Sequence, residues 1–102
     1  MAILIATTAA QSISVPDRTL YEGETIDVTY SDPNIQNRFV HVTVNNGDHV
    51  NPQVDTVEIW LGPDGKGSRP YTVRTGWWGA VFNCRGAAEV TRSVSPPGQD
   101  RT

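Results

Sequence analysis

The stretch that decides the fold is Thr25-Ile26-Asp27-Val28-Thr29-Tyr30. Its apolar side chains stand at every second position, so Ile26, Val28 and Tyr30 share one face and polar residues occupy the other. This two-residue period is typical of a strand that buries one face, because successive side chains of a strand point to opposite sides. The turn-forming residues 31–34 follow directly. We therefore predict a half-buried strand over residues 25–30 that ends in a turn.

The same alternation recurs at residues 39–44 and 56–61. The side chains predicted to point inward are Val40, Val42, Val44, Val57, Ile59 and Leu61. Asn45-Asn46-Gly47-Asp48 predicts a turn after the first of these strands. The loop at residues 62–67 contains Asp64-Gly65, a pair that readily adopts the positive φ of a hairpin turn. We expect it to lead back into a strand at residues 69–74.

The C-terminal part predicts a second hairpin. In a strand over residues 77–84, Trp78, Ala80, Phe82 and Cys84 share one face. A turn at residues 85–86 leads into the strand at residues 87–94. A lone cysteine on such an apolar face is usually a small buried hydrophobic residue, so we expect Cys84 to be buried and inert.

The composition indicates one all-β domain. The 102 residues include 12 Val, 6 Ile and 11 Thr but only 3 Leu, and β-branched side chains favour a pleated sheet over a helix. Residues 3–7 and 12–15 predict a first strand that breaks and switches sheets. We assign residues 1–14 to an N-terminal segment or first strand, residues 15–94 to the domain, and residues 95–102 to an exposed tail. About seven short strands in this length predict an antiparallel two-sheet β-sandwich, with a small barrel as the competing architecture.

The order of residues 22–30, 64–68 and 88–94 resembles bacterial and phage immunoglobulin-like modules. The resemblance covers residues 15–94 and implies an immunoglobulin-like β-sandwich. The chain departs from true immunoglobulin domains because it has only one cysteine, and because residues 39–44 contain no tryptophan. The resemblance therefore does not imply antibody-type recognition.

Several function classes find no support in the sequence. The net charge of −3 and the pI of 5.1 lack the basic excess of a nucleic-acid binder. The longest apolar run, residues 2–6, is too short to span a bilayer, and the first basic residue is Arg18, which argues against a signal peptide. There is no Gly-x-Ser-x-Gly motif, and His41 and His49 with one cysteine do not make a zinc motif. We expect no catalytic residue, no metal and no cofactor.

Aromatic and arginine residues are the candidates for an interaction surface. Trp77 and Trp78 are adjacent, so a strand cannot place both in one core, and Trp60 shares its face with Glu58. An exposed tryptophan near arginines would suit a sugar ring or a protein partner. Alternatively, Trp77 caps the end of the sandwich. The candidate interaction residues are Trp60, Arg69, Tyr71, Arg74 and Trp77, together with the apolar N-terminal residues Ile3, Leu4 and Ile5.

Small immunoglobulin-like chains with a tail and without a signal peptide resemble decoration and accessory proteins of phage virions. This resemblance implies a non-enzymatic protein in the virion that binds a capsid or tail subunit or associates with itself. Ile3, Leu4 and Ile5 would either pair with the domain's own sheet or add a strand to a neighbouring subunit. The alternative is a carbohydrate-binding or adhesive module of a bacterial surface, with Trp60 or Trp77 as the contact. A cytoplasmic location is a further alternative.

Overall fold

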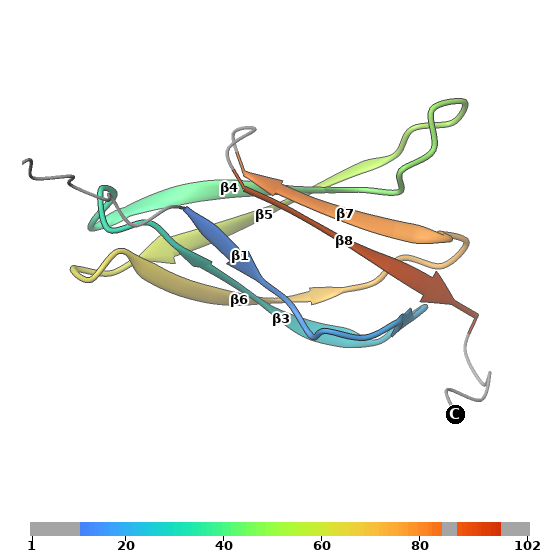
Figure 1. The fold of residues 1–102 in the computed structure, drawn as a ribbon, viewed down its shortest axis with the longest axis horizontal. Helices are drawn as coiled ribbons and strands as arrows, with labels where there is room; N and C mark the ends of the chain where they lie inside the picture. Colours follow the sequence, from blue (N-terminus) through green and yellow to red (C-terminus); the bar gives the residue numbers. More distant parts are fainter. Residues whose placement is uncertain (1–10, 85–87, 97–102) are drawn as a thin grey trace, which may run out of the picture.

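Two β-sheets face each other in the computed structural model, which describes residues 11–84 and 88–96 (Figure 1). In spatial order the first sheet contains β1 (Ser12–Ser14), β3 (Thr25–Ser31) and β6 (Lys66–Thr72). The second contains β2 (Leu20–Tyr21), β8 (Ala88–Ser95), β7 (Gly79–Cys84), β4 (Arg38–Asn45) and β5 (Val54–Leu61). Strands make up 59% of the described residues and none of these residues is helical. The all-β prediction is confirmed.

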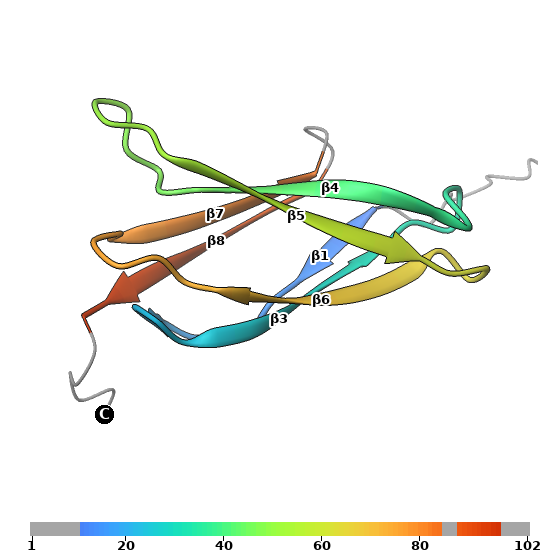
Figure 2. The same cartoon turned by 180° about the vertical axis from the view of Figure 1, so that it is seen from behind.

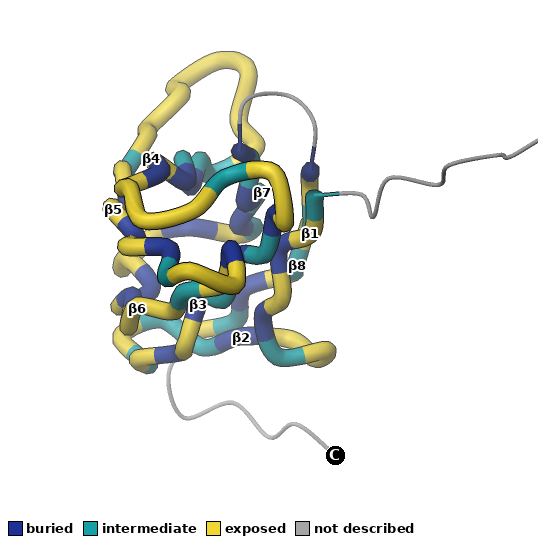
Figure 3. Tube along the Cα trace, turned by 90° about the vertical axis from the view of Figure 1, so that its left-hand side faces the viewer, coloured by how far each residue is buried: buried dark blue, intermediate teal, exposed yellow. Residues whose placement is uncertain are grey.

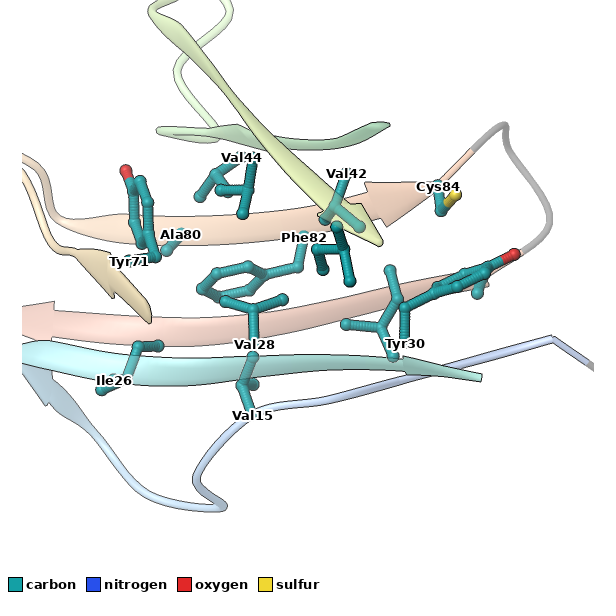
Figure 4. Close-up of a cluster of buried hydrophobic side chains, with 14 of the residues drawn as sticks. Val15, Ile26, Val28, Tyr30, Val42, Val44, Tyr71, Ala80, Phe82 and Cys84 are labelled. Atoms are coloured by element: carbon teal, nitrogen blue, oxygen red, sulfur yellow. The ribbon is translucent and has the colours of Figure 1, made fainter. Parts of the chain in front are cut away.

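The predicted inward faces form the core between the two sheets. All the apolar positions predicted to face inward in β3, β4 and β5 are buried, as the two-residue period predicts. In Figure 4 the Phe82 ring of β7 lies in the middle of this cluster, with Val28 of β3 facing it. Tyr71 meets the same ring edge-on, with 6.1 Å between the ring centroids. Cys84 is fully buried, which confirms the predicted burial of this residue.

The loop at residues 62–67 does not make the predicted return within one sheet. It does reverse the chain, because Gly65 has a φ of 76° and the Gly62 N–H donates to the Lys66 carbonyl at 3.0 Å. However, β5 pairs with β4, whereas β6 pairs with β3 along its whole length. The loop therefore carries the chain from the second sheet to the first. Alternation predicts a strand and its faces but not the strand that it pairs with, which explains the error.

The described chain changes sheets after the Pro16-Asp17 turn, whereas the predicted change between residues 3–7 and 12–15 lies partly outside the described residues. β1 pairs antiparallel with β3, and β2 then pairs parallel with β8. β2 was not predicted, since two residues show no period, and its parallel pairing means that the second sheet is not wholly antiparallel. This sheet curls into a half-barrel, and Figure 3 shows the buried positions on the inside of the two layers.

The C-terminal hairpin is confirmed, because β7 and β8 pair antiparallel from Gly79↔Ser93 to Cys84↔Ala88. Other predictions lie outside the described residues. These are the strand at residues 3–7, the candidates Ile3, Leu4 and Ile5, the turn at residues 85–86 and the tail beyond Pro96. No helix that could cross a bilayer occurs among residues 11–84 and 88–96.

Candidate functional site

The two adjacent tryptophans lie in the loop between β6 and β7 and have opposite environments. Trp77 is buried, whereas the side chain of Trp78 is 88% exposed. The prediction that Trp78 shares the buried face of Ala80 is wrong. β7 begins only at Gly79, and Gly76 with a φ of 89° turns the chain just before the two tryptophans. Strand alternation therefore does not extend back to Trp78.

Three hydrogen bonds fix the backbone that carries Trp78. The Gly76 N–H donates to Glu22 Oε1 at 2.5 Å, and the Val94 N–H donates to the Trp78 carbonyl at 2.9 Å. Between them, the buried Trp77 indole N–H donates to Gln53 Oε1 at 2.7 Å. Trp77 thus caps this end of the sandwich, as one of the two accounts predicted, and it is not a surface contact. Trp78 projects from a firmly held turn.

The loop between β4 and β5 extends beyond the same end of the molecule, as the green segment in Figures 1 and 2 shows. Asp48 Oδ1 accepts the N–H groups of Val50 at 2.8 Å and Asn51 at 3.2 Å. These backbone hydrogen bonds hold the pKa of the Asp48 carboxyl below its ordinary value. Asn46 Oδ1 accepts two further backbone N–H groups of the loop. The loop is therefore internally braced, and it presents Val50 with 84% of its surface exposed.

Trp78 borders two shallow hollows at this end. The larger measures about 300 Å³ and is lined by Asn46, Gly47, Asp48, Gly76, Trp77 and Trp78. The smaller measures about 150 Å³ and is lined by Glu22, Gly76, Trp77, Trp78, Val94 and Pro96. We call Trp78 together with Glu22 and Asp48 the Trp78 site. It offers an exposed aromatic ring that borders two hollows, one lined by Asp48 and the other by Glu22.

A second aromatic surface lies on the outer face of the five-stranded sheet. Phe39 and Trp60 are register partners, each about half exposed, and their rings meet edge-on with centroids 5.0 Å apart. The next outward pair is His41 and Glu58, whose side chains lie 3.0 Å apart. Trp60, a predicted candidate, is thus accessible, but it lies away from Trp78.

The other predicted candidates join the facing edge strands β5 and β6 (Figure 2). Arg69 donates to the Glu58 carbonyl at 3.0 Å, and the Tyr71 hydroxyl donates to Asp55 Oδ2 at 2.7 Å. Arg74 binds both oxygens of Asp55, at 2.9 and 2.5 Å. We call these contacts the β5–β6 seam.

The seam shifts the pKa values of two of these side chains. Burial and the Asp55 hydrogen bond raise the pKa of Tyr71, and the hydrogen bond to Asp55 raises that of Arg74. Arg69, Tyr71 and Arg74 therefore join the two sheets along this edge.

Sequence reasoning missed Trp78 as the most exposed aromatic side chain of the described chain. Glycines on both sides of the pair, Gly76 and Gly79, were the available signal, because they indicate a turn better than a strand. Residues 11–84 and 88–96 contain no group of three potential metal ligands. Compared with known proteins, the chain matches no family model and none of the curated proteins.

Proposed function

We propose that this chain is a non-enzymatic interaction module that binds a protein surface through the Trp78 site. The observation that carries the proposal is the 88% exposed Trp78 on a backbone fixed by hydrogen bonds from three directions. An exposed indole is costly in water, and aromatic anchors of this kind dominate the binding energy of interfaces. Since the turn is already ordered, little conformational entropy is lost when a partner binds it.

The strand order supports an immunoglobulin-like sandwich as the scaffold. In that fold, strands A, B and E lie in one sheet with D, while G, F and C lie in the other, joined by C′ in variable-type domains. Here β1-β3-β6 takes the places of A, B and E, and β8-β7-β4-β5 takes those of G, F, C and C′. Strand D has no counterpart among the described strands. By this correspondence the turn that carries Trp78 is the E–F loop and residues 46–53 are the C–C′ loop. The Trp78 site therefore lies at the end opposite the B–C, C′–C″ and F–G loops that bind antigen in variable domains.

The hydrogen bonds around Trp78 favour a protein over a sugar. Recognition of a sugar needs free polar groups beside the aromatic ring. Asn46 and the Trp77 indole N–H line the hollows, but both are already hydrogen-bonded within the chain. The acceptors that remain are the carboxylates of Glu22 and Asp48, and their negative charge suits a cationic group of a protein better than the neutral hydroxyls of a sugar.

We further propose that the protein surface is a capsid or tail subunit of a phage virion, on the basis of the resemblance to virion accessory proteins. The alternative is a carbohydrate-binding module of a bacterial surface, which the exposed rings of Trp60 and Trp78 would also suit. In the virion proposal, residues 1–10 can add a further contact, and their deletion leaves the core strands in place.

The genes that flank the coding sequence identify the particle to test. The purified chain is then mixed with that particle and sedimented, and in parallel it is applied to a glycan array. Sedimentation with the particle and no retained glycan supports the proposal. A chain that stays in the supernatant and retains an oligosaccharide contradicts it and favours the alternative, and a chain that binds neither contradicts both.

A further inference from the structure

Neither carboxylate of the Trp78 site takes part in an ion pair within residues 11–84 and 88–96. The ion pairs in this part of the chain join Arg18 to Glu24, His41 to Glu58, Arg74 to Asp55 and Arg92 to Asp17. Glu22 and Asp48 belong to none of them. Each hollow beside the exposed indole therefore presents a carboxylate without an ion-pair partner, and the neighbouring basic residue is His49, next to Asp48.

Each of these carboxylates uses one oxygen to brace a loop. Glu22 Oε1 accepts the Gly76 N–H, and Asp48 Oδ1 accepts the N–H groups of Val50 and Asn51. Within the described chain the second oxygen of each has no hydrogen-bond donor. Because the bracing bonds also favour the ionised form of Asp48, its charge is present at neutral pH.

We propose that the Trp78 site receives an arginine side chain of the protein partner, an inference that rests on the proposed function. The guanidinium stacks on the Trp78 ring and donates N–H groups to the free carboxylate oxygen of the hollow that it enters, that of Glu22 or that of Asp48. A planar guanidinium suits both demands at once, since it stacks on aromatic faces and donates in several directions.

Other partner groups fit this surface less well. A lysine ammonium is a compact point charge that cannot stack as a plane, and a quaternary ammonium has no N–H to donate. An anionic group would be repelled by both carboxylates. A purely apolar partner would cover the two carboxylates without pairing them, and no ion pair or hydrogen bond would then offset the cost of their desolvation.

Titration with a small probe tests the inference without knowledge of the partner. N-acetyl-arginine-N-methylamide is added to the ¹⁵N-labelled chain, and the indole N–H signals, assigned by single Trp→Phe variants, are followed by NMR. The citrulline analogue is the matched control, since it has the shape of arginine without the charge. We expect a saturable shift of the Trp78 signal with the arginine compound, a much smaller shift with citrulline, and little response of Trp60.

Glu22→Gln and Asp48→Asn test the carboxylates separately from the fold, because each variant keeps the oxygen that braces its loop. We expect each to weaken binding of the arginine compound about two- to fivefold, in line with exposed ion pairs, and the double variant to weaken it further. Glu58→Gln, beside Trp60, is the control and leaves binding unchanged. An equal response to citrulline, an unaffected double variant or an equal shift of Trp60 would overturn the inference.

The two proposals can fail separately. If the chain sediments with its particle but shows no arginine-specific shift of Trp78, the arginine inference is wrong while the interaction function stands. If the shift occurs but neither particle nor any other protein surface is bound, the proposed function is wrong.

Discussion

Gly67 of β6 lies directly against the carbonyl oxygen of Trp60 in β5, so closely that a Cβ atom at position 67 would overlap that oxygen. The two edge strands belong to different sheets, and this approach brings them together where no ladder of backbone hydrogen bonds joins them. The side chains of the β5–β6 seam complete the closure. An otherwise open pair of sheet edges is thereby protected from pairing with other chains.

Because Gly67 lies so close to the Trp60 carbonyl oxygen, we predict that Gly67→Ala destabilises the fold. The backbone of β5 must move to admit a methyl group, and overpacking of this kind costs about 1–3 kcal/mol. Gly79→Ala is the matched control, since its Cβ would lie 3.6 Å from the nearest atom, the Arg92 carbonyl oxygen. Urea unfolding followed by fluorescence measures both. Equal stabilities of the two variants would contradict the role given to Gly67.

Asp55→Asn tests the polar contacts of the seam. The substitution removes the charge that receives two hydrogen bonds from Arg74 and one from Tyr71. Because Arg74 is 57% exposed, solvent screens the pair, and we expect a loss of about 1 kcal/mol in the free energy of unfolding. Glu58→Gln, which removes an exposed pair with His41, should change it by less than about 0.5 kcal/mol. A larger loss of stability in Glu58→Gln than in Asp55→Asn would show that the seam does not stabilise the fold.

From the raised pKa of Tyr71 we predict that the folded chain loses stability at alkaline pH. Burial, aided by Asp55, raises the pKa of its phenol above the ordinary value of 10.0. The unfolded chain then releases this proton at a lower pH than the folded chain, so the stabilisation is complete below pH 10.0 and decreases as the pH rises above it.

Unfolding of the wild type and of Tyr71→Phe at about pH 9 and about pH 11 measures how much Tyr71 contributes to the pH dependence of the free energy of unfolding. The fall in stability between the two pH values should be smaller in the variant. A fall of the same size in both chains would mean that Tyr71 does not titrate differently in the two states.

Cys84 provides a test of the core. Its side chain is fully buried beside the Phe82 face, so a thiol reagent reaches it only when the structure opens. We expect labelling in the native state to be at least about 100-fold slower than in urea. A Thr56→Cys chain with Cys84→Ala places a thiol at an exposed position and should label rapidly. Rapid labelling of native Cys84 would contradict the packing described here.

The faces of β3, β4 and β5 could be predicted because a period of two residues records which side of a strand meets the core. The partners of the strands could not. β6 pairs with β3 across 35 to 47 residues of sequence, and nothing local in residues 66–72 records that choice. β2 contains two residues, too few to show any period.

The candidate site was harder to predict than the strands. The assignment of Trp78 to the core extended the alternation of Ala80, Phe82 and Cys84 backwards across Gly79, although the strand begins there. Arg69, Tyr71 and Arg74 were grouped with an exposed tryptophan because arginine and aromatic residues are common in interfaces. The same residue types also join one sheet to another, and only the placement of edge strand β6 against edge strand β5 separates the two roles.

Co-sedimentation of the Trp78→Ala and Trp60→Ala variants with the particle tests the central claim most directly. Both variants remove an exposed indole, so they differ in the surface that is altered and not in the kind of side chain that is lost. We expect Trp78→Ala to weaken binding at least tenfold, as loss of an interface anchor does, and Trp60→Ala to weaken it less than about threefold. Equal weakening, or a larger effect of Trp60→Ala, would show that the Trp78 site is not the binding surface.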